Sequence, residues 1–437
     1  MVSTSSTTLP VLVIGLLAGV AALGLVANEL GRRTGLSLPA RMLLSGELGM
    51  GVLAVGSKVV ILAVLAEAEG RALAAAGTAM REATDTFLAP DRTAQDGPAI
   101  SVAPRRMTTW RALPEAPPAP AGNRTTDAKV ALGRVLFNDP NLSLDRDISC
   151  ASCHLLAEGG DDNARYAVGH RGQVGDRNAP TVYNAAFLTR LFWDGRATSL
   201  EAQAAVPLTN PVEMALPSAD LAVARLREDP RYGPLFAAAF SGADPVSFAN
   251  LTRAIAAYER ELVTPDTPYD RYIRGDDSAL TPEALRGMAL FDAVGCRTCH
   301  IDPMFSAAGT EKPRGVFRRF PVFTDANPFL ETYDLLIDGA PARFRVPSLR
   351  NVALTAPYFH NGSVEGLEEA IRVMAVSQLG RVLSNDPLDD VAVLSVAVAG
   401  EAPGRNTGLV TGRALSDREV ADIAAFLRAL TADSLPR

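Results

Sequence analysis

Cysteine and histidine are scarce in this chain. Only four of each occur among 437 residues, and there are two tryptophans. An excess of positive charge is also missing, because the formal net charge is −7 and the sequence pI is about 5.3, which argues against a nucleic-acid partner. All four cysteines fall in two short motifs, so none is left for a disulfide. The cysteines are therefore evidence about these two motifs, and they give no information on whether the protein is in an oxidising or a reducing compartment.

The two motifs share the pattern Cys-x-x-Cys-His, which is typical of covalent c-type haem attachment. They consist of Cys150, Cys153 and His154, and of Cys296, Cys299 and His300. The two thiols of such a motif lie on one face of a helical turn and reach both vinyl groups of one porphyrin, while the histidine becomes the proximal iron ligand. A zinc site would need four ligands grouped together, and a redox motif would not need the histidine twice. The sequence therefore predicts two covalent haems.

The first 89 residues predict a membrane anchor. Residues 9–27 are almost wholly apolar and long enough to span a bilayer. A cleaved signal peptide is the alternative, but residues 2–8 lack its usual basic segment. Residues 48–66 are a second apolar stretch around Lys58, which predicts either a second span or a helix lying on the membrane. We favour two transmembrane helices, followed by a further helix over residues 67–88.

Composition and periodicity divide the chain into four parts. These are the anchor over 1–89, a Pro-rich linker over 90–122, a first haem domain over 123–245 and a second haem domain over 246–437. The expected fold is mainly α, with two cytochrome c-like haem domains and loop-rich connections. Helices are predicted over residues 126–137, 199–206, 247–262, 281–291, 367–375 and 416–430. Covalent haem attachment in bacteria is completed outside the cytoplasm, so we expect the haem domains on the periplasmic side of the cytoplasmic membrane, anchored by the N-terminal helices.

Residues 111–434 resemble the bacterial dihaem cytochrome c peroxidase family. The matching segments are 132–137, 149–154, 177–182, 192–197, 210–214, 344–351 and 355–363. Many motifs in the same order make this resemblance far more specific than Cys-x-x-Cys-His alone. It implies an enzyme, a cytochrome-c peroxidase, that reduces hydrogen peroxide to water. The electron donor would be a reduced cytochrome c, a cupredoxin or a membrane donor.

The resemblance assigns roles around the first haem. His170 would be a distal iron ligand that is released when the second haem is reduced, Glu213 the catalytic acid–base with Gln203 beside it, and Trp193 an electron bridge between the haems. A carboxylate near both peroxide oxygens can move a proton from one to the other, which avoids expelling hydroxide. From the residues alone, His170 would be a structural histidine and Glu213 a solvated charge. Core packing of Trp193 is compatible with bridging.

Around the second haem, the resemblance implies Met374 as the sixth iron ligand and Arg345 near the propionates or the iron. It also keeps His360 near this haem, as a structural or electron-entry residue. His–Met ligation raises the reduction potential, which suits a haem that accepts electrons from a mild donor. Without the resemblance, a methionine in an amphipathic helix such as 367–375 is usually a core residue.

The resemblance further implies one calcium ion between the domains. Its ligands would be the side chain of Asn178 and the backbone carbonyls of Thr355 and Pro357, which with waters suit a hard cation. The chain departs from the family pattern over residues 381–412, where a hairpin or flap is predicted. A homodimer is a further interpretation that we consider.

Two other functions remain open at this point. One is a dihaem oxidase that modifies a partner protein, although such relatives have a tyrosine in place of Met374 and lack the releasable His170. The other is a membrane-tethered dihaem cytochrome that only transfers electrons, against which Glu213 and Gln203 argue.

Overall fold

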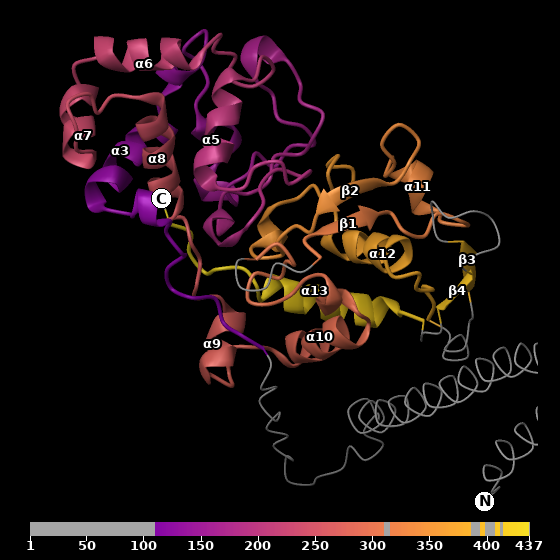
Figure 1. Cartoon of the computed structure of the whole chain (residues 1–437). Helices are drawn as coiled ribbons and strands as arrows, with labels where there is room; N and C mark the ends of the chain where they lie inside the picture. Colours follow the sequence, from indigo (N-terminus) through magenta and orange to yellow (C-terminus); the bar gives the residue numbers. More distant parts are fainter. Residues whose placement is uncertain (1–109, 310–314, 386–393, 398–406, 411–413, 437) are drawn as a thin grey trace, which may run out of the picture. The chain divides into compact units, whose positions relative to one another are not determined.

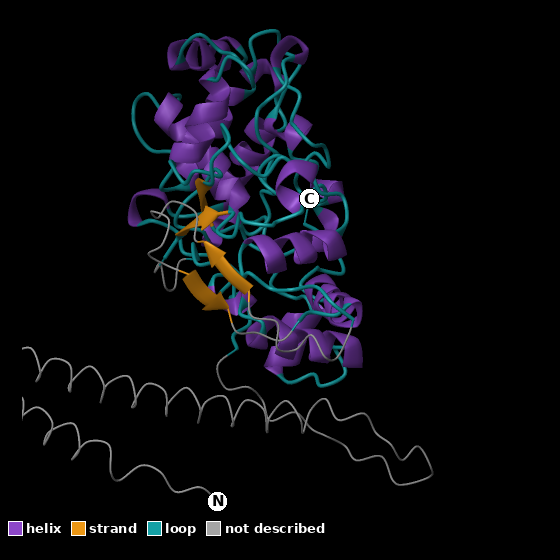
Figure 2. Ribbon diagram, turned by 90° about the vertical axis from the view of Figure 1, so that its right-hand side faces the viewer, coloured by secondary structure: helices purple, strands orange, loops and turns teal. Residues whose placement is uncertain are grey.

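Helices form most of the regular structure, as the periodicity predicts (Figure 1, Figure 2). The computed structural model describes residues 110–309, 315–385, 394–397, 407–410 and 414–436. The membrane anchor predicted over residues 1–89 lies outside these ranges, as does most of the predicted linker. Within the described ranges, no helix combines the length and the apolar character needed to cross a bilayer.

The predicted helices begin within one residue of their expected starts. They are α3 (Asp127–Phe137), α5 (Leu200–Thr209), α8 (Phe248–Glu259), α10 (Pro282–Ala293), α12 (Leu367–Ser377) and α13 (Asp417–Arg428). Three further helices were not predicted: α6 (Ala219–Glu228), α7 (Tyr232–Ala239) and α9 (Pro268–Arg274). The caps that the sequence predicts at Thr126 and Ser199 are confirmed, and Ser247, Thr281 and Ser416 cap their helices in the same way. The remaining short helices used below are α4 (Cys150–Cys153) and α11 (Phe329–Thr332).

One predicted helix end is wrong. The sequence predicts that Pro207 ends its helix, but α5 continues through it to Thr209. Proline removes only one intrahelical donor at this position. The carbonyl of Pro207 accepts the amide of Met214 at 3.2 Å, and the carbonyl of Leu208 accepts that of Leu216 at 2.9 Å, so the following loop satisfies the last turn.

The first hydrophobic core is built where α3 crosses α8, with α5, α6 and α7 around them (Figure 1). Gly133 permits this close approach, since a Cβ there would lie 2.0 Å from the carbonyl oxygen of Ala254. Leu251, Ile255 and Tyr258 of α8 pack with residues of α3. The predicted domain boundary at residue 245 therefore falls too early, because α8 shares the core of the first haem domain.

The second core lies between α10 and α13, beside α12 (Figure 1). Its centre is an aromatic cluster of Trp110, Tyr269, Phe291, Phe305 and Phe426. Trp110 is 5% exposed and Leu113, nearby in the chain, is 1% exposed. The described end of the predicted linker is therefore part of the packed domain.

Two small antiparallel sheets complete the described structure. β1 (Phe317–Phe320) pairs with β2 (Ala342–Arg345). β3 (Leu394–Ala397) pairs with β4 (Thr407–Val410), inside the segment that departs from the family pattern. This pairing is the one expected of the predicted hairpin.

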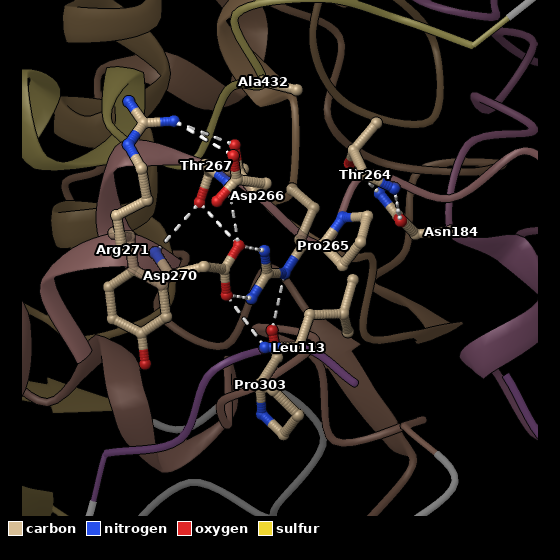
Figure 3. A network of polar contacts seen from close by, with 12 residues as sticks. Leu113, Asn184, Thr264, Pro265, Asp266, Thr267, Asp270, Arg271, Pro303 and Ala432 are labelled. Carbon is tan, nitrogen blue, oxygen red and sulfur yellow. Dashed lines mark hydrogen bonds and ion pairs between the residues drawn. The ribbon is translucent and has the colours of Figure 1, made fainter. Parts of the chain in front are cut away.

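A buried ion pair fastens the N-terminal described segment to the second domain (Figure 3). The Arg350 guanidinium donates to both oxygens of Asp270, at 2.6 and 2.9 Å, and both side chains are fully buried. Asp270 also accepts the amide of Leu113 at 2.8 Å, and Arg350 donates to the carbonyl of Pro303 at 2.7 Å. Removing one partner from such a pair typically costs about 3–5 kcal/mol, because it leaves the other charge buried and unpaired.

The C-terminal residues return to the first domain. The Tyr183 hydroxyl donates to the carbonyl oxygen of Pro436 at 2.6 Å, and Leu435 packs against the first core. Tyr183 itself is buried in that core. The chain therefore runs from the first haem domain into the second after α8, and it returns to the first domain after α13.

Candidate functional site

The first Cys-x-x-Cys-His motif forms one helical turn, α4, as the spacing predicts. A capping box between Ser149 and Ser152 fixes its start. His154 follows the turn, and its Nδ1 lies 3.1 Å from the carbonyl oxygen of Gly160. Because a carbonyl can only accept, Nδ1 must carry the hydrogen, which leaves the Nε2 lone pair free for a metal. This is the arrangement required of a proximal haem ligand.

The second motif has the same arrangement. Cys296–Thr298 is a 3₁₀ turn, and His300 Nδ1 lies 3.0 Å from the carbonyl oxygen of Phe305. Burial lowers the pKa of His300 to about 4, so this imidazole is neutral near pH 7 and able to bind a metal through Nε2.

The surroundings of the cysteines are apolar. Burial raises the pKa of Cys150 and Cys296 to about 12 and that of Cys153 to about 11. In the described ranges, no group of three or more His, Cys, Asp or Glu side chains gathers around a common point. Cysteines in an apolar setting fit thioether attachment.

His170 and Glu213 lie next to each other, although the chain separates them by more than forty residues. The backbone amide of His170 donates to the carbonyl oxygens of Val212 and Glu213, at 3.0 and 2.8 Å. Gly169 makes this contact close, because a Cβ there would lie 2.0 Å from the Val212 carbonyl. His170 is 6% exposed, and its Nδ1 is buried without a hydrogen-bond partner among the described residues.

The carboxylate of Glu213 is held beside the first motif. Asn210 donates to its Oε1 at 2.5 Å, and Glu213 acts electrostatically on both Cys150 and Cys153. Burial raises the pKa of Glu213, whereas the Asn210 bond and the charge of Arg196 lower it. A half-buried carboxyl with a raised pKa beside a histidine is suited to moving a proton.

Gln203 lies on α5, the helix that ends just before Asn210. It is half-buried, and within the described part of the chain no hydrogen bond joins it to Glu213. Its predicted place beside Glu213 therefore rests on the resemblance.

The second motif opens into a large apolar cavity. Its lining includes Cys296, Cys299 and His300, and also Met374, Arg345, His360 and Trp193. The structure thus brings together the residues that the resemblance assigns to the second haem. His360 is 3% exposed and stacks on Phe344 at a centroid distance of 4.5 Å.

Arg345 and Trp193 are joined directly. The amide of Arg345 donates to the carbonyl of Trp193 at 2.8 Å, and its Nε donates to the carbonyl of Phe192 at 3.1 Å. Arg345 is 4% exposed, and burial lowers its pKa to about 10, so it remains a buried cation near pH 7. The indole of Trp193 reaches from this cavity to the carbonyl of Asn178, to which its Nε1 donates at 2.8 Å.

Comparison with known proteins decides the family. The family described as "Di-haem cytochrome c peroxidase" matches residues 127–278. Cytochrome c551 peroxidase of Nitrosomonas europaea is 39% identical over 273 residues, which cover 62% of this chain and 80% of that protein. This chain belongs to the di-haem cytochrome c peroxidase family.

Two further similarities place this di-haem family member among its relatives. Cytochrome c peroxidase Ccp of Escherichia coli is 42% identical over 283 residues, which cover 63% of this chain but only 58% of that protein. The crystal structure of a MauG-like protein associated with microbial copper homeostasis is 32% identical, with a TM-score of 0.58 over 74% of this chain and 95% of that one. The relatives support an oxidoreductase that acts on peroxide.

Family membership implies two c-type haems, and the residues present fit them. Each motif offers two cysteines and a histidine whose Nδ1 is hydrogen-bonded, so that only Nε2 is available to iron. The second motif also opens into a cavity that a planar apolar group can enter.

The residues predicted to bind calcium are among those that line the same cavity, namely Asn178, Thr355 and Pro357. Asn178 uses its Nδ2 to donate to the carbonyl of Ala164 at 2.9 Å. The calcium site itself stays a prediction.

Sequence reasoning missed three charged residues near the motifs. Glu259 at the end of α8 is 4% exposed and acts electrostatically on Cys150, and Arg318 of β1 donates to Cys299 Sγ at 3.2 Å. Asp145 pairs with Arg171, which holds the pKa of that carboxyl below its usual range. The only local signal for any of these was the position of Asp145 a few residues before Cys150.

Proposed function

We propose that this protein reduces hydrogen peroxide to water with electrons from a reduced cytochrome c or a similar donor. The observation that carries the proposal is the half-buried carboxyl of Glu213 near the first Cys-x-x-Cys-His motif, on a segment whose backbone is bonded to that of His170. Each peroxide takes up two electrons and two protons and gives two waters. When bound, the two c-type haems would supply the electrons.

Glu213 is proposed to transfer a proton between the two oxygens of peroxide. Peroxide must lose a proton from the oxygen that becomes bound, and the oxygen that leaves must gain one. Burial raises the pKa of Glu213, which favours its holding a proton, so this carboxyl is suited to accepting a proton from one oxygen and returning it to the other. Asn210 orients it through the bond to Oε1, and Gln203 is proposed to face the same substrate space.

The residues around the second motif suit electron storage. His300 and Met374 would ligate one iron, and a thioether ligand favours the reduced state. The buried cation of Arg345 acts in the same direction, since it stabilises an added electron. Trp193, held by Arg345 and Asn178, is proposed to carry electrons toward the first haem.

Further parts of the proposal concern the surroundings of the enzyme. Asn178, Thr355 and Pro357 are proposed to hold one Ca²⁺ through a side-chain oxygen and two carbonyls. Since c-type haem is attached outside the bacterial cytoplasm, we propose a periplasmic location, with the N-terminal apolar stretches as an anchor. The donor would then be a small redox protein or a membrane component.

The second candidate is a dihaem enzyme that oxidises residues of a partner protein. The structural likeness to a MauG-like protein favours it. The two candidates differ at the second motif, where Met374 supports electron storage from a mild donor.

The test is steady-state peroxide turnover with a reduced cytochrome c by Glu213→Gln. We expect kcat to fall by about 100-fold or more, because Gln keeps the shape but cannot carry the proton. Absorption spectra should still show two attached haems. Glu228→Gln, at an exposed site on α6, is the matched control and should retain turnover. Wild-type activity in Glu213→Gln would remove the carboxyl from the mechanism, and a wild-type protein without peroxide-dependent oxidation would leave only electron transfer.

A further inference from the structure

His170 is carried by a small loop at the surface of the first domain. The loop closes through a single antiparallel bridge between Val168 and Val174, and these valines are 57% and 59% exposed. Between them, Arg171 adopts the left-handed conformation with φ 53° and ψ 34°, which is unfavourable for a residue other than glycine. Such a loop has little hydrophobic packing of its own and depends on specific contacts for its position.

One set of contacts comes from the Glu213 segment. The amide of His170 donates to the carbonyls of Val212 and Glu213, and Gln173 Nε2 donates to the carbonyl of Pro211 at 3.0 Å. These bonds seat the loop on the segment that carries the catalytic carboxyl. They also mean that a movement of the His170 backbone away from this segment frees the carbonyl of Glu213.

A second set of contacts comes from Asp145, in the turn before the first motif. Arg171 Nε donates to Asp145 Oδ2 at 2.8 Å, and Arg171 Nη2 donates to Oδ1 at 3.3 Å. The same Oδ2 lies 3.7 Å from Nδ1 of His170, the buried nitrogen without a hydrogen-bond partner among the described residues. Asp145 therefore binds Arg171 and faces the imidazole ring of His170, the residue before it.

We propose that Asp145 and Arg171 form a latch that sets how readily His170 leaves the first haem. The latch rests on the proposed function, because His170 must be a distal ligand for its release to matter. A carboxylate facing Nδ1 fixes the imidazole with Nε2 as the donor atom and strengthens that donor. The two-point contact with Arg171 holds the loop against the domain. Asp145 is thus a positioning residue, which acts through His170.

The latch also couples His170 to Glu213. While Asp145 and Arg171 are paired, the loop stays seated and the Val212 and Glu213 carbonyls stay bonded. Once the pair opens, the same movement that removes His170 frees the Glu213 segment. The departure of His170 from the position where peroxide binds and the release of the segment that carries Glu213 then occur in the same movement.

The experiment compares Asp145→Asn and Arg171→Gln in the fully oxidised holoprotein. Cyanide is the probe, because it binds the first iron only after His170 has left, so its association rate follows the released fraction. We expect the rate to rise by about tenfold in Asp145→Asn and by about threefold in Arg171→Gln. The high-spin signal of the first haem in electron paramagnetic resonance should grow in the same order.

Arg227→Gln is the matched control. It removes another exposed pair of the first domain, Arg227 with Asp244, and should change the cyanide rate by less than about twofold. Gly169→Ala is the positive control, since its Cβ would collide with the Val212 carbonyl and unseat the loop whether or not the latch is intact. Circular dichroism and the haem absorbance check that each variant is folded and loaded.

The outcomes separate the latch from the proposed function. If both latch variants match Arg227→Gln while Gly169→Ala binds cyanide faster, the latch is wrong, and peroxide turnover by the wild type is untouched by that result. An oxidised wild type whose first haem is already high-spin would also overturn it. A wild type that never turns over peroxide would instead overturn the proposed function.

Discussion

The two Cys-x-x-Cys-His sites are alike in their proximal geometry and differ in the ionisable groups around them. Both histidines bond Nδ1 to a carbonyl within a few residues, at 3.1 and 3.0 Å. Close to the first motif lie carboxyls with raised pKa values, Glu213 and Glu259. Close to the second lie Arg345, buried in the cavity, and Arg318, bonded to Cys299, while the motif's own Arg297 is paired with the buried Asp302 at 2.8 Å.

This difference shows how one attachment motif can serve two tasks. Groups that accept and return protons suit a site where oxygen chemistry takes place. Fixed cations suit a site that holds an electron, because they stabilise the reduced state without exchanging protons. The attachment motif itself carries none of this information, so the distinction depends on residues brought in from other helices and strands. Three substitutions test it, each at one of the two sites.

The largest effect is expected at Glu259, beside the first motif. Burial and the nearby Glu201 raise its pKa to about 8, against an ordinary value of 4.5, while Arg260 lowers it. Between pH 4.5 and 8, the folded protein therefore keeps a proton that the unfolded chain releases, so the free energy of unfolding falls as pH rises. Glu259→Gln should remove on the order of 3 kcal/mol of this pH dependence.

Denaturant unfolding of the holoprotein at pH 5 and pH 8 measures the Glu259 effect. Glu261→Gln, at an exposed position of the same segment, is the control and should follow the wild type. Equal pH dependence in Glu259→Gln and the wild type would mean that this carboxyl is not protonated in the folded protein.

At the second site, Met374→Leu tests the sixth ligand. Loss of the thioether should lower the reduction potential of this haem by about 100 mV or more and leave that of the first haem unchanged. Spectroelectrochemical titration separates the two potentials. Met288→Leu, a buried methionine of the second core outside the cavity lining, is the control. An unchanged potential in Met374→Leu would make this methionine an ordinary packing residue.

A smaller effect is expected from the charge of Arg345. Arg345→Gln should lower the potential of the second haem by about 50 mV, the size expected for one buried charge several ångströms away. Arg345→Lys keeps the charge and should restore most of the potential, although it loses the bond to the Phe192 carbonyl. If Lys and Gln give the same potential, Arg345 acts through the position of the Trp193 segment and not through its charge.

Features that depend on residues close together in the chain could be predicted from the sequence. The haem-attachment turns and the caps at Thr126 and Ser199 depend on residues a few positions apart, and the structure confirms both. The assignment of α8 was wrong because apolar periodicity shows which face of a helix is buried but not which partner covers it.

The missing parts of the site are long-range contacts. Asp145 and Arg171 are 26 residues apart, and the Arg345 guanidinium reaches a carbonyl 153 residues away. Single-sequence patterns contain no signal for such pairs. Gln203, Glu213 and Met374 were identified only because longer motifs resemble a known family, and their roles remain predictions.

The return of the chain end to the first domain has a mechanical consequence. Three stretches of chain run between the domains: residues 114–126 lead from the second core to α3, residues 260–267 lead from α8 to α9, and residues 429–436 lead from α13 back to the first domain. The hydrogen bond from Tyr183 to the carbonyl of Pro436 fastens the last of these. Together they form closed loops of chain, which limit how far the two haem domains can rotate against each other.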